Sequence, residues 1–452
     1  MSRLVGAILV LVAASLILAG AATARAVEPG QQDTALWTWG WNNYGQVGGA
    51  EIVDQPSPGH NGPAQVYRLA GGGLHSLASD TGGQVWAWGR NNHGQLGLPP
   101  DENRHPQPAI VSGVSGVIAV SGGAEHSIAL KSDGTVWAWG GNAQGELGNG
   151  STDSSSTPVR VSGLDHVTAI SAGYHHNLAL KSDGTVWVWG NNGDGQLGLG
   201  DRYDRYQPEA VPGLTSIVAV AAGGRHSLAL RSDGAVLAWG LNDRGQLGNA
   251  SLDTSLTPTA VHLAASASAL AAGYEHSVAL GTDGKVWAWG DNTFRQLGAS
   301  ATTTYSDSPI QVADVQGVTG IVAGYAHTLA VKSDRTLWAW GDNSFGQLGI
   351  GPNGASSGPV PVPGLAQISI IGAGYDHSLA LEGDPVLPPT PTPTATPVPP
   401  SPTPTRTPTP SPTRTPTASA TPTASATPTA TATSTPTATP SVKHIYFPGL
   451  WR

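Results

Sequence analysis

The sequence predicts an all-β protein, a seven-bladed β-propeller made of repeats of about 50 residues. Three observations support this prediction: a Trp-Gly pair recurs seven times at spacings of 49 to 51 residues, the units share a hairpin signal, and the repeat region starts and stops within a unit. Self-similarity at such a fixed period indicates a repeat architecture. The glycines of the pair are Gly40, Gly89, Gly140, Gly190, Gly240, Gly290 and Gly341.

Each full unit reads as four short strands. In the stretch "SGGAEHSIALKSDGTVWAWGGNAQGELG", Asp133 and Gly134 separate two β-prone runs and supply the left-handed conformations of a tight turn. One further run precedes this hairpin and one follows it, which is the description of a propeller blade. Arg335 replaces the turn glycine after Asp334, so we expect a strained turn or another turn type there.

The two ends of the repeat region complement each other. Residues 37–48 are the second half of a unit, and residues 373–384 are the first half of one. A solenoid would instead carry atypical capping repeats at its ends. We therefore expect the N- and C-terminal half-repeats to pair as one blade and close the ring, which also hides the edge strands.

The repeated tryptophans and histidines have a structural interpretation. Large aromatic side chains at equivalent places in the units are expected to fill the wedges between adjacent blades. The histidines stand apart around a ring and cannot converge on one metal ion, so we expect buried imidazoles that tie a strand to its neighbour. The two sets are Trp39, Trp88, Trp139, Trp189, Trp239, Trp289 and Trp340, and His75, His126, His176, His226, His276, His327 and His377.

The repeat resembles that of a known family. The stretch "GYHHNLALKSDGTVWVWGNNGDGQLGLG", residues 173–200, is similar to the repeat of the regulator of chromosome condensation family. The resemblance covers roughly residues 36–384 and implies a seven-bladed propeller, here expected to be of a bacterial secreted type. Its founding eukaryotic member is known as a guanine-nucleotide exchange factor for a small GTPase, but a shared fold does not carry that activity over.

The candidate binding residues are those that break the repeat. The loop "G-x-x-H" has two free positions, and it emerges on the same face of the ring as the "N-x-x-G-Q-L-G" loop. Tyrosine and arginine are favoured at binding hot spots, although ordinary surface variation is the alternative interpretation. The candidates are Tyr174, His175, Arg225, Tyr274, Glu275, Tyr325, Tyr375, Asp376 and, in the other loop, Trp41.

No stretch of the sequence predicts catalysis. There is no phosphate-binding loop, no serine-nucleophile signature and no zinc-protease motif, and the chain has no cysteine. His93 and His175 are extra to the histidine pattern, and we expect both to be solvated loop residues, because neither has a carboxylate-and-histidine constellation nearby. We therefore expect no catalytic residue, no metal site and no cofactor.

The two ends of the chain differ from the repeats in composition. Residues 1–26 read as a signal peptide, with an uncleaved membrane anchor as the alternative, and residues 27–384 as the propeller. Residues 385–441 are a Pro/Thr-rich segment, expected to be a disordered and stiff linker. Residues 442–452 form a short hydrophobic tail, for which an incidental end and a cell-surface attachment signal stay open.

Charge and location narrow the expected partners. Six of the 21 basic residues lie in the end segments but none of the 30 acidic ones does, which leaves residues 27–384 with a formal net charge of −15. Such a surface disfavours nucleic acid. We expect a monomeric, extracellular or bacterial cell-surface module that binds a protein or a glycan. The alternatives are an extracellular lyase or hydrolase with a site at the channel mouth and, last, an exchange factor.

Overall fold

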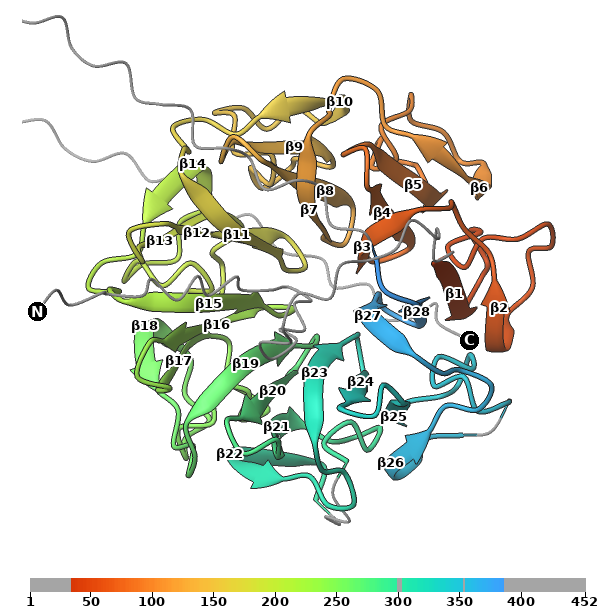
Figure 1. The fold of residues 1–452 in the computed structure, drawn as a ribbon. Coiled ribbons are helices and arrows are strands. Elements are labelled where there is room, and N and C mark those ends of the chain that lie inside the picture. The colour runs from red at the N-terminus through yellow and green to blue at the C-terminus, as the bar shows by residue number, and fades with distance from the viewer. Residues whose placement is uncertain (1–33, 299–302, 353, 386–452) are drawn as a thin grey trace, which may run out of the picture. The chain divides into compact units, whose positions relative to one another are not determined.

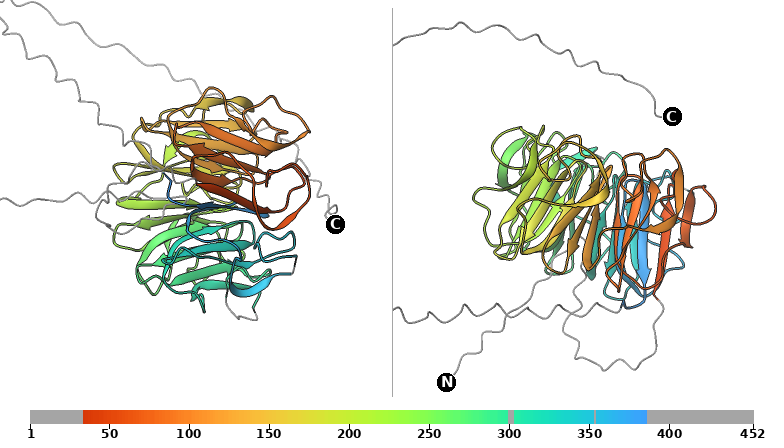
Figure 2. Two further views of the ribbon diagram at one scale, coloured as in Figure 1. Left: turned by 45° about the vertical axis from the view of Figure 1, so that its right-hand side comes forward. Right: turned by 90° about the horizontal axis from the view of Figure 1, so that it is seen from above.

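The computed structural model describes residues 34–298, 303–352 and 354–385, which form seven four-stranded antiparallel sheets and no helix. Figure 1 shows the sheets arranged around a central axis, and Figure 2 shows the same ring from two other sides. The predicted all-β, seven-bladed propeller is confirmed. No helix in the described part of the chain could span a membrane. The predicted signal peptide and C-terminal tail, and the predicted linker apart from Pro385, lie outside the described residues.

We number the blades in chain order and call the last one the closing blade. Blades 1 to 6 each consist of four consecutive strands, and the closing blade combines two strands from each end of the repeat region. The blades span residues 66–110, 117–160, 167–210, 217–260, 267–311 and 318–361, and the closing blade spans 368–382 with 35–60.

The first strand of each blade lies innermost and lines a central channel. Small residues are required there because neighbouring blades approach closely: a Cβ on Gly122 would lie 2.7 Å from the Cα of Gly72 in the preceding blade. These strands are β3 (Val66–Gly71), β7 (Val117–Gly122), β11 (Val167–Ala172), β15 (Ile217–Ala222), β19 (Ala267–Ala272), β23 (Val318–Ala323) and β27 (Ile368–Ala373).

The second strand of each blade is buried on both faces, because adjacent blades cover both sides of the sheet. This explains why the run "H-S-L-A-L" consists mostly of apolar and small residues; Asn177, which follows His176, is an exception. These strands are β4 (His75–Asp80), β8 (His126–Lys131), β12 (His176–Lys181), β16 (His226–Arg231), β20 (His276–Gly281), β24 (His327–Lys332) and β28 (His377–Glu382).

The third strand of each blade pairs with the second through the predicted hairpin and ends at the glycine of the Trp-Gly pair. Gly134, Gly184 and Gly234 in the hairpin turns have φ values of 78°, 80° and 86°, which glycine adopts without strain. The third strands are β5 (Val85–Arg90), β9 (Val136–Gly140), β13 (Val186–Gly190), β17 (Val236–Gly240), β21 (Val286–Asp291), β25 (Leu337–Gly341) and β1 (Ala35–Gly40).

The fourth strand of each blade is the outer edge, where side chains are half-buried or exposed. Proline is tolerated at an edge because no ladder hydrogen bond is lost there, and each fourth strand contains at least one proline. These strands are β6 (Arg104–Ile110), β10 (Ser155–Arg160), β14 (Arg205–Ala210), β18 (Ser255–Ala260), β22 (Tyr305–Gln311), β26 (Ser356–Pro361) and β2 (Gln55–His60).

The turn at Asp334 and Arg335 is a strained copy of the usual hairpin turn. Arg335 has a φ of 65°, and its N–H donates to the carbonyl of Lys332 at 2.8 Å, as the glycine does in the other blades. Its guanidinium reaches the closing blade, where it donates to the carbonyl of Gln367 and pairs with Asp384 at 2.9 Å. The first of the two expected alternatives, strain, is therefore confirmed.

The closing blade joins the two ends of the repeat region as predicted. β1 pairs antiparallel with β28 along its whole length, from Ala35 opposite Glu382 to Gly40 opposite His377. The indole Nε1–H of Trp37 also donates to the Glu382 carboxylate at 2.9 Å. The sheet order β2-β1-β28-β27 repeats the order of every other blade.

The repeated tryptophans fill the wedges between blades. Trp139 in blade 2 is fully buried and packs in a cluster with Leu77, Val85 and Leu96 of blade 1. Its neighbour two positions earlier, Trp137, is only partly buried at the edge of the same cluster. All seven tryptophans predicted to be structural, one in each blade, have no exposed surface.

The repeated histidines bind from blade to blade rather than within one sheet. In blade 1, His75 Nε2 lies 2.9 Å from the hydroxyl of Ser127 in blade 2, and that hydroxyl donates to the carbonyl of Gln95 in blade 1. The same carbonyl accepts the indole N–H of Trp139 at 2.8 Å. Because the hydroxyl proton is used on the carbonyl, the imidazole must donate through Nε2–H. We call this arrangement the junction relay.

The junction relay occurs at every junction, including the one that closes the ring. His377 in the closing blade contacts the hydroxyl of Ser76 in blade 1 at 2.9 Å, and this hydroxyl donates to the carbonyl of Gln46. Of the seven tryptophans in these relays, Trp88 is the one whose indole N–H has no hydrogen-bond partner among the described residues. The remaining histidine contacts are His126–Asn177, His176–Ser227, His226–Ser277, His276–Thr328 and His327–Ser378.

A glycine three residues before each histidine makes room for the imidazole. A Cβ on Gly123 would lie 2.0 Å from Cε1 of His126, and a Cβ on Gly273 would lie 2.2 Å from Cε1 of His276. Burial lowers the pKa of His226 and His327 to about 3, so these imidazoles stay neutral. The "G-x-x-H" motif is thus the local requirement for burying a neutral imidazole between blades.

Deletion of residues 35–48 removes β1 and should open the ring. We expect the deleted protein to lose its cooperative thermal transition, because β28 and the Trp39 wedge are both left uncovered. Tryptophan fluorescence during heating measures this, with truncation after Pro385 as the matched control. A melting temperature within a few degrees of that of the control would contradict ring closure.

Acidification should destabilise the protein before its carboxylates titrate. Buried histidines with a pKa of about 3 bind no proton in the fold, whereas the unfolded chain binds protons below about pH 6.5. The free energy of unfolding should therefore fall by about 1.4 kcal/mol per buried histidine between pH 7.5 and 5.5, opposed only in part by Asp376 with its raised pKa. In urea unfolding, the free energy of unfolding of His226→Asn should depend less on pH than that of the parent protein. The fall between pH 7.5 and 5.5 should be smaller by about 1.4 kcal/mol. An unchanged slope would contradict a neutral His226.

Candidate functional site

Two kinds of loop meet on one face of the ring. The "G-x-x-H" loop joins the first and second strands, and the "N-x-x-G-Q-L-G" loop follows the third strand. They are held together by backbone bonds such as Gly141 N–H to Glu125 carbonyl at 2.7 Å and Trp41 N–H to Asp376 carbonyl at 2.8 Å. We call the surface formed by these two sets of loops the mouth face.

The "N-x-x-G-Q-L-G" loops are internally hydrogen-bonded. In blade 2, the Asn142 carboxamide accepts the backbone N–H of Leu147 at 2.8 Å and donates to the carbonyls of Ser151 and Asp153. The asparagine of the motif thus satisfies loop backbone groups that would otherwise be buried without partners. The loops therefore present their variable residues from a rigid backbone.

The four candidate tyrosines contact one another at the axis. Tyr174 stacks on Tyr375 with ring centroids 5.6 Å apart, and Tyr274 stacks on Tyr325 at 4.3 Å. The two pairs meet edge to face, Tyr174 with Tyr274 at 5.4 Å and Tyr325 with Tyr375 at 5.6 Å. We call these four residues the tyrosine plug. Its rings form a closed cycle contributed by four different blades.

The tyrosine plug lies against a central cavity of about 150 Å³ lined mainly by glycine and alanine. The remaining blades carry small residues at the equivalent position, which gives the rings space: a Cβ on Gly224 would lie 2.5 Å from the ring of Tyr274. Burial raises the pKa of Tyr274, Tyr325 and Tyr375. These three phenols therefore stay neutral, and Tyr325 is the most exposed member of the plug at 37%.

The second free position of the loop forms charge pairs between blades. Arg225 of blade 4 lies 3.6 Å from Asp194 of blade 3, and Glu275 of blade 5 lies 4.0 Å from Arg244 of blade 4. Glu125 of blade 2 lies 3.1 Å from His93 of blade 1. Candidate residues Arg225 and Glu275 thus have partners within the chain, and their side chains remain partly exposed.

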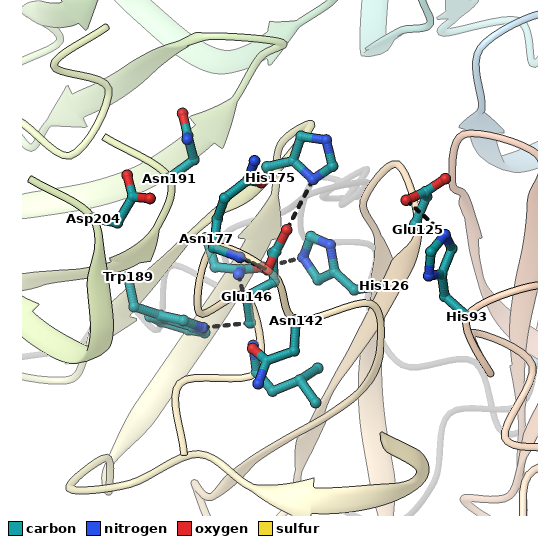
Figure 3. A network of polar contacts seen from close by, with 12 residues as sticks. His93, Glu125, His126, Asn142, Glu146, His175, Asn177, Trp189, Asn191 and Asp204 are labelled. Carbon is teal, nitrogen blue, oxygen red and sulfur yellow. Dashed lines mark hydrogen bonds and ion pairs between the residues drawn. The ribbon is translucent and has the colours of Figure 1, made fainter. Parts of the chain in front are cut away.

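Glu146 and His175 form a buried version of such a pair. Figure 3 shows His175 Nδ1 directed at the Glu146 carboxylate, at 2.9 Å, while the other carboxylate oxygen accepts the N–H of Gln144. The backbone carbonyl of Glu146 also accepts from Asn177 and Trp189 in the junction relay. Burial alone would raise the pKa of Glu146, but the bond from His175 lowers it below its usual value.

The expectation that His93 and His175 are no more than solvated loop residues was wrong. His93 pairs with Glu125 at 3.1 Å and His175 with Glu146 at 2.9 Å, each across a blade junction. The missed signal was the glutamate itself, because "GELG" in blade 2 departs from the "GQLG" of other units. Both pairs depend on which loop residues of neighbouring blades face each other: Glu125 lies in the blade after His93, and Glu146 in the blade before His175.

Trp41 belongs to an aromatic group at the junction between blade 6 and the closing blade. Its ring lies 5.3 Å from that of Phe345 in blade 6 and 6.1 Å from that of Tyr44. The guanidinium of Arg90 covers Tyr44 at 5.0 Å. Trp41 is partly buried and Phe345 is 37% exposed. We call Trp41 and Phe345 the aromatic shelf.

Asp376, the last candidate residue, is mostly enclosed beside the aromatic shelf. The Gln347 carboxamide donates to Asp342 at 3.0 Å and to Asp376 at 3.3 Å, so it bridges two carboxylates. Burial and the neighbouring charge of Asp342 raise the pKa of Asp376 to about 7. Within the described ranges, no three histidine or acidic side chains gather as a metal ion would need.

The Glu146–His175 pair should be energetically coupled. We expect the free energies of unfolding of Glu146→Gln, His175→Ala and the double variant to give a coupling of about 1 kcal/mol, because the carboxylate is buried at 3% exposure. The exposed pair Asp165–His166 is the matched control and should show no measurable coupling. Equal coupling in the two cycles would contradict a structural role specific to Glu146.

Family models match most of the propeller. The model described as the RCC1-like domain matches residues 162–387, half of the chain. Two models of the regulator of chromosome condensation repeat match residues 82–130 and 133–180, and residues 66–95 and 117–146. These matches agree with the resemblance that the repeat motif predicted.

Curated relatives are similar over part of their length. The probable E3 ubiquitin-protein ligase HERC3 of Homo sapiens is 35% identical over 133 residues, 28% of this chain and 13% of that protein. The ultraviolet-B receptor UVR8 of Arabidopsis thaliana is 32% identical over 136 residues, 29% of this chain and 30% of that protein. Because these relatives are eukaryotic, the expected bacterial secreted type is not confirmed.

Solved structures share the fold. Human WBSCR16 has a TM-score of 0.71 at 25% identity and covers 78% of this chain and 100% of its own. Prp20p of Saccharomyces cerevisiae, at 24% identity with a TM-score of 0.70 over 78% of this chain and 92% of its own, shows the fold alone. With a family model matching half of its residues and every blade built on the same relay, the chain belongs to the RCC1-like domain family.

Proposed function

We propose that this propeller is a binding module that recognises another macromolecule through the mouth face. The observation that carries the proposal is the distribution of variation. The scaffold positions repeat from blade to blade, whereas the two free positions of the "G-x-x-H" loop differ between blades and lie together on the mouth face. Variable residues on loops held by a rigid scaffold are the usual arrangement of a recognition surface.

The exposed side chains of the mouth face suit a protein–protein contact. Tyr325 and Phe345 are both 37% exposed, Phe294 is 40% exposed, and the Arg225 side chain is 51% exposed. Aromatic residues and arginine are enriched where interfaces gain most of their binding energy. Tyr325 packs against Tyr274 and Tyr375 within the tyrosine plug, so its ring loses little conformational entropy when a partner docks.

The relatives' names do not carry an activity to this chain. A ubiquitin ligase, a light receptor and a protein described by its binding to Gsp1p and histones share this fold. The curated relatives align over no more than 30% of their own length. What these proteins have in common with the present chain is the propeller, which supports a binding or regulatory role.

We further propose that the module acts outside the cell or on its surface. Residues 1–26 have the charged start, apolar stretch and small-residue end of an export signal. Residues 385–441 are rich in proline and threonine, as in extended spacers between surface-attached parts. N-terminal sequencing of the protein recovered from the medium should then begin near residue 27, and recovery only from inside the cell would contradict export.

Capture from the extracellular fraction of the native host tests the binding proposal. We expect immobilised full-length protein to retain a specific partner, and Tyr325→Ala with Arg225→Ala to lose at least ten-fold of it. Tyr203→Ala, at a ring 75% exposed in the segment leading to β14, is the matched control and should retain it. Melting curves confirm that each variant is folded. Equal capture by all variants would contradict recognition through the mouth face.

A further inference from the structure

The charge pairs of the mouth face follow a rule that one junction breaks. Where the second free position of a "G-x-x-H" loop is charged or histidine, a group of opposite charge in the preceding blade faces it in blades 2 to 5. In the closing blade this position is Asp376, and the loop of blade 6 that faces it presents Asp342 instead of a base. Like charges therefore meet at this junction without a facing base. Glu275 also has carboxylates near it, because burial and then Asp243 and Asp291 raise its pKa, but it keeps Arg244 at 4.0 Å.

No cation of the described residues compensates the two carboxylates. Gln347 donates to both, at 3.0 Å and 3.3 Å, and Ser344 donates to Asp342. None of the ion pairs formed by the described residues includes Asp342 or Asp376. The raised pKa of Asp376 reflects this setting: burial and a neighbouring negative charge disfavour its ionised form.

The aromatic shelf borders the same junction. Trp41 donates its backbone N–H to the carbonyl of Asp376 at 2.8 Å, and Phe345 lies three residues after Asp342 in the same loop. The two rings are 5.3 Å apart and tilted by 30°, and Phe345 is 37% exposed. An exposed aromatic ring thus borders Asp376, which has no basic side chain beside it, whereas Asp342 is only 7% exposed and accepts from Ser344 and Gln347.

Both features attract a cation, and one cation can satisfy both. The face of an aromatic ring is electron-rich and attracts a nearby ammonium or guanidinium group. This chain already makes such contacts, with the nitrogen of Lys131 5.6 Å from the ring of Trp137 and that of Lys181 5.1 Å from the ring of Trp187. A planar guanidinium can stack on a ring while it donates to a carboxylate, which a compact ammonium does less well.

We propose that the aromatic shelf and Asp376 bind an arginine side chain of a protein partner, with the buried Asp342 adding negative charge at this junction. The inference rests on the proposed function and names the chemistry that the mouth face recognises at this junction. Charge complementarity supports it over an acidic partner, because residues 27–384 carry a formal net charge of −15. The partner supplies the positive charge that a base in blade 6 would supply if this junction followed the rule.

Titration of the full-length protein with a fluorescently labelled hexaarginine peptide tests the inference, with hexacitrulline as its neutral counterpart. We expect saturable binding of hexaarginine only. Asp376→Asn and Phe345→Ala should each weaken it at least five-fold. Glu125→Gln, at the same loop position but in a compensated pair, should change it less than two-fold. Phe345→Ala removes an exposed ring, so it remains informative if Asp376→Asn fails to fold.

The outcomes separate this inference from the proposed function. Equal weakening by Asp376→Asn and Glu125→Gln would mean attraction by net charge alone and would overturn the inference. Binding of hexacitrulline as tight as that of hexaarginine, or no binding of either, would also overturn it. Partner capture that depends on Tyr325 and Arg225 but persists in Asp376→Asn would overturn the inference while leaving the proposed function intact.

Discussion

The propeller depends on a neutral imidazole held at each blade junction. His226, for example, donates to the Ser277 hydroxyl of the next blade at 2.8 Å, and this hydroxyl in turn donates to the carbonyl of Gln246. A net hydrogen bond stabilises a fold by only about 1 kcal/mol, but a buried group left without its partner costs more. Each relay is therefore more important for specifying how two blades meet than for the energy it adds, and the wedge tryptophan beside it supplies the apolar burial.

The relay also determines what the mouth face can present. The histidine and the glycine three residues before it leave two loop positions free in every blade. The first points to the axis, where four tyrosines from four blades form the tyrosine plug. The second lies against the preceding blade, where opposite charges meet at four junctions and like charges at one. Scaffold and recognition are thus carried by adjacent residues of one short loop.

Much of this structure could be predicted from the sequence, because repetition reveals it. The seven blades, the wedge tryptophans and the closing pair of β1 and β28 follow from equivalent positions in equivalent units. The contacts between blades could not be predicted in the same way, because they depend on which residues of neighbouring loops face each other. Glu146 and His175 are 29 residues apart and lie in different units. Reading each departure from the repeat against the preceding unit would have found this pair, and also Asp194 with Arg225.

The central claim is that the ring is one cooperative unit closed by equivalent junction relays. Hydrogen exchange followed by mass spectrometry on Ser277→Ala, which breaks the relay between blades 4 and 5, tests it most directly. If the account is right, exchange of the buried second strands rises together in all seven blades, because opening one junction releases the whole ring. Faster exchange confined to blades 4 and 5 would contradict the account and would mean that the blades are independently stable.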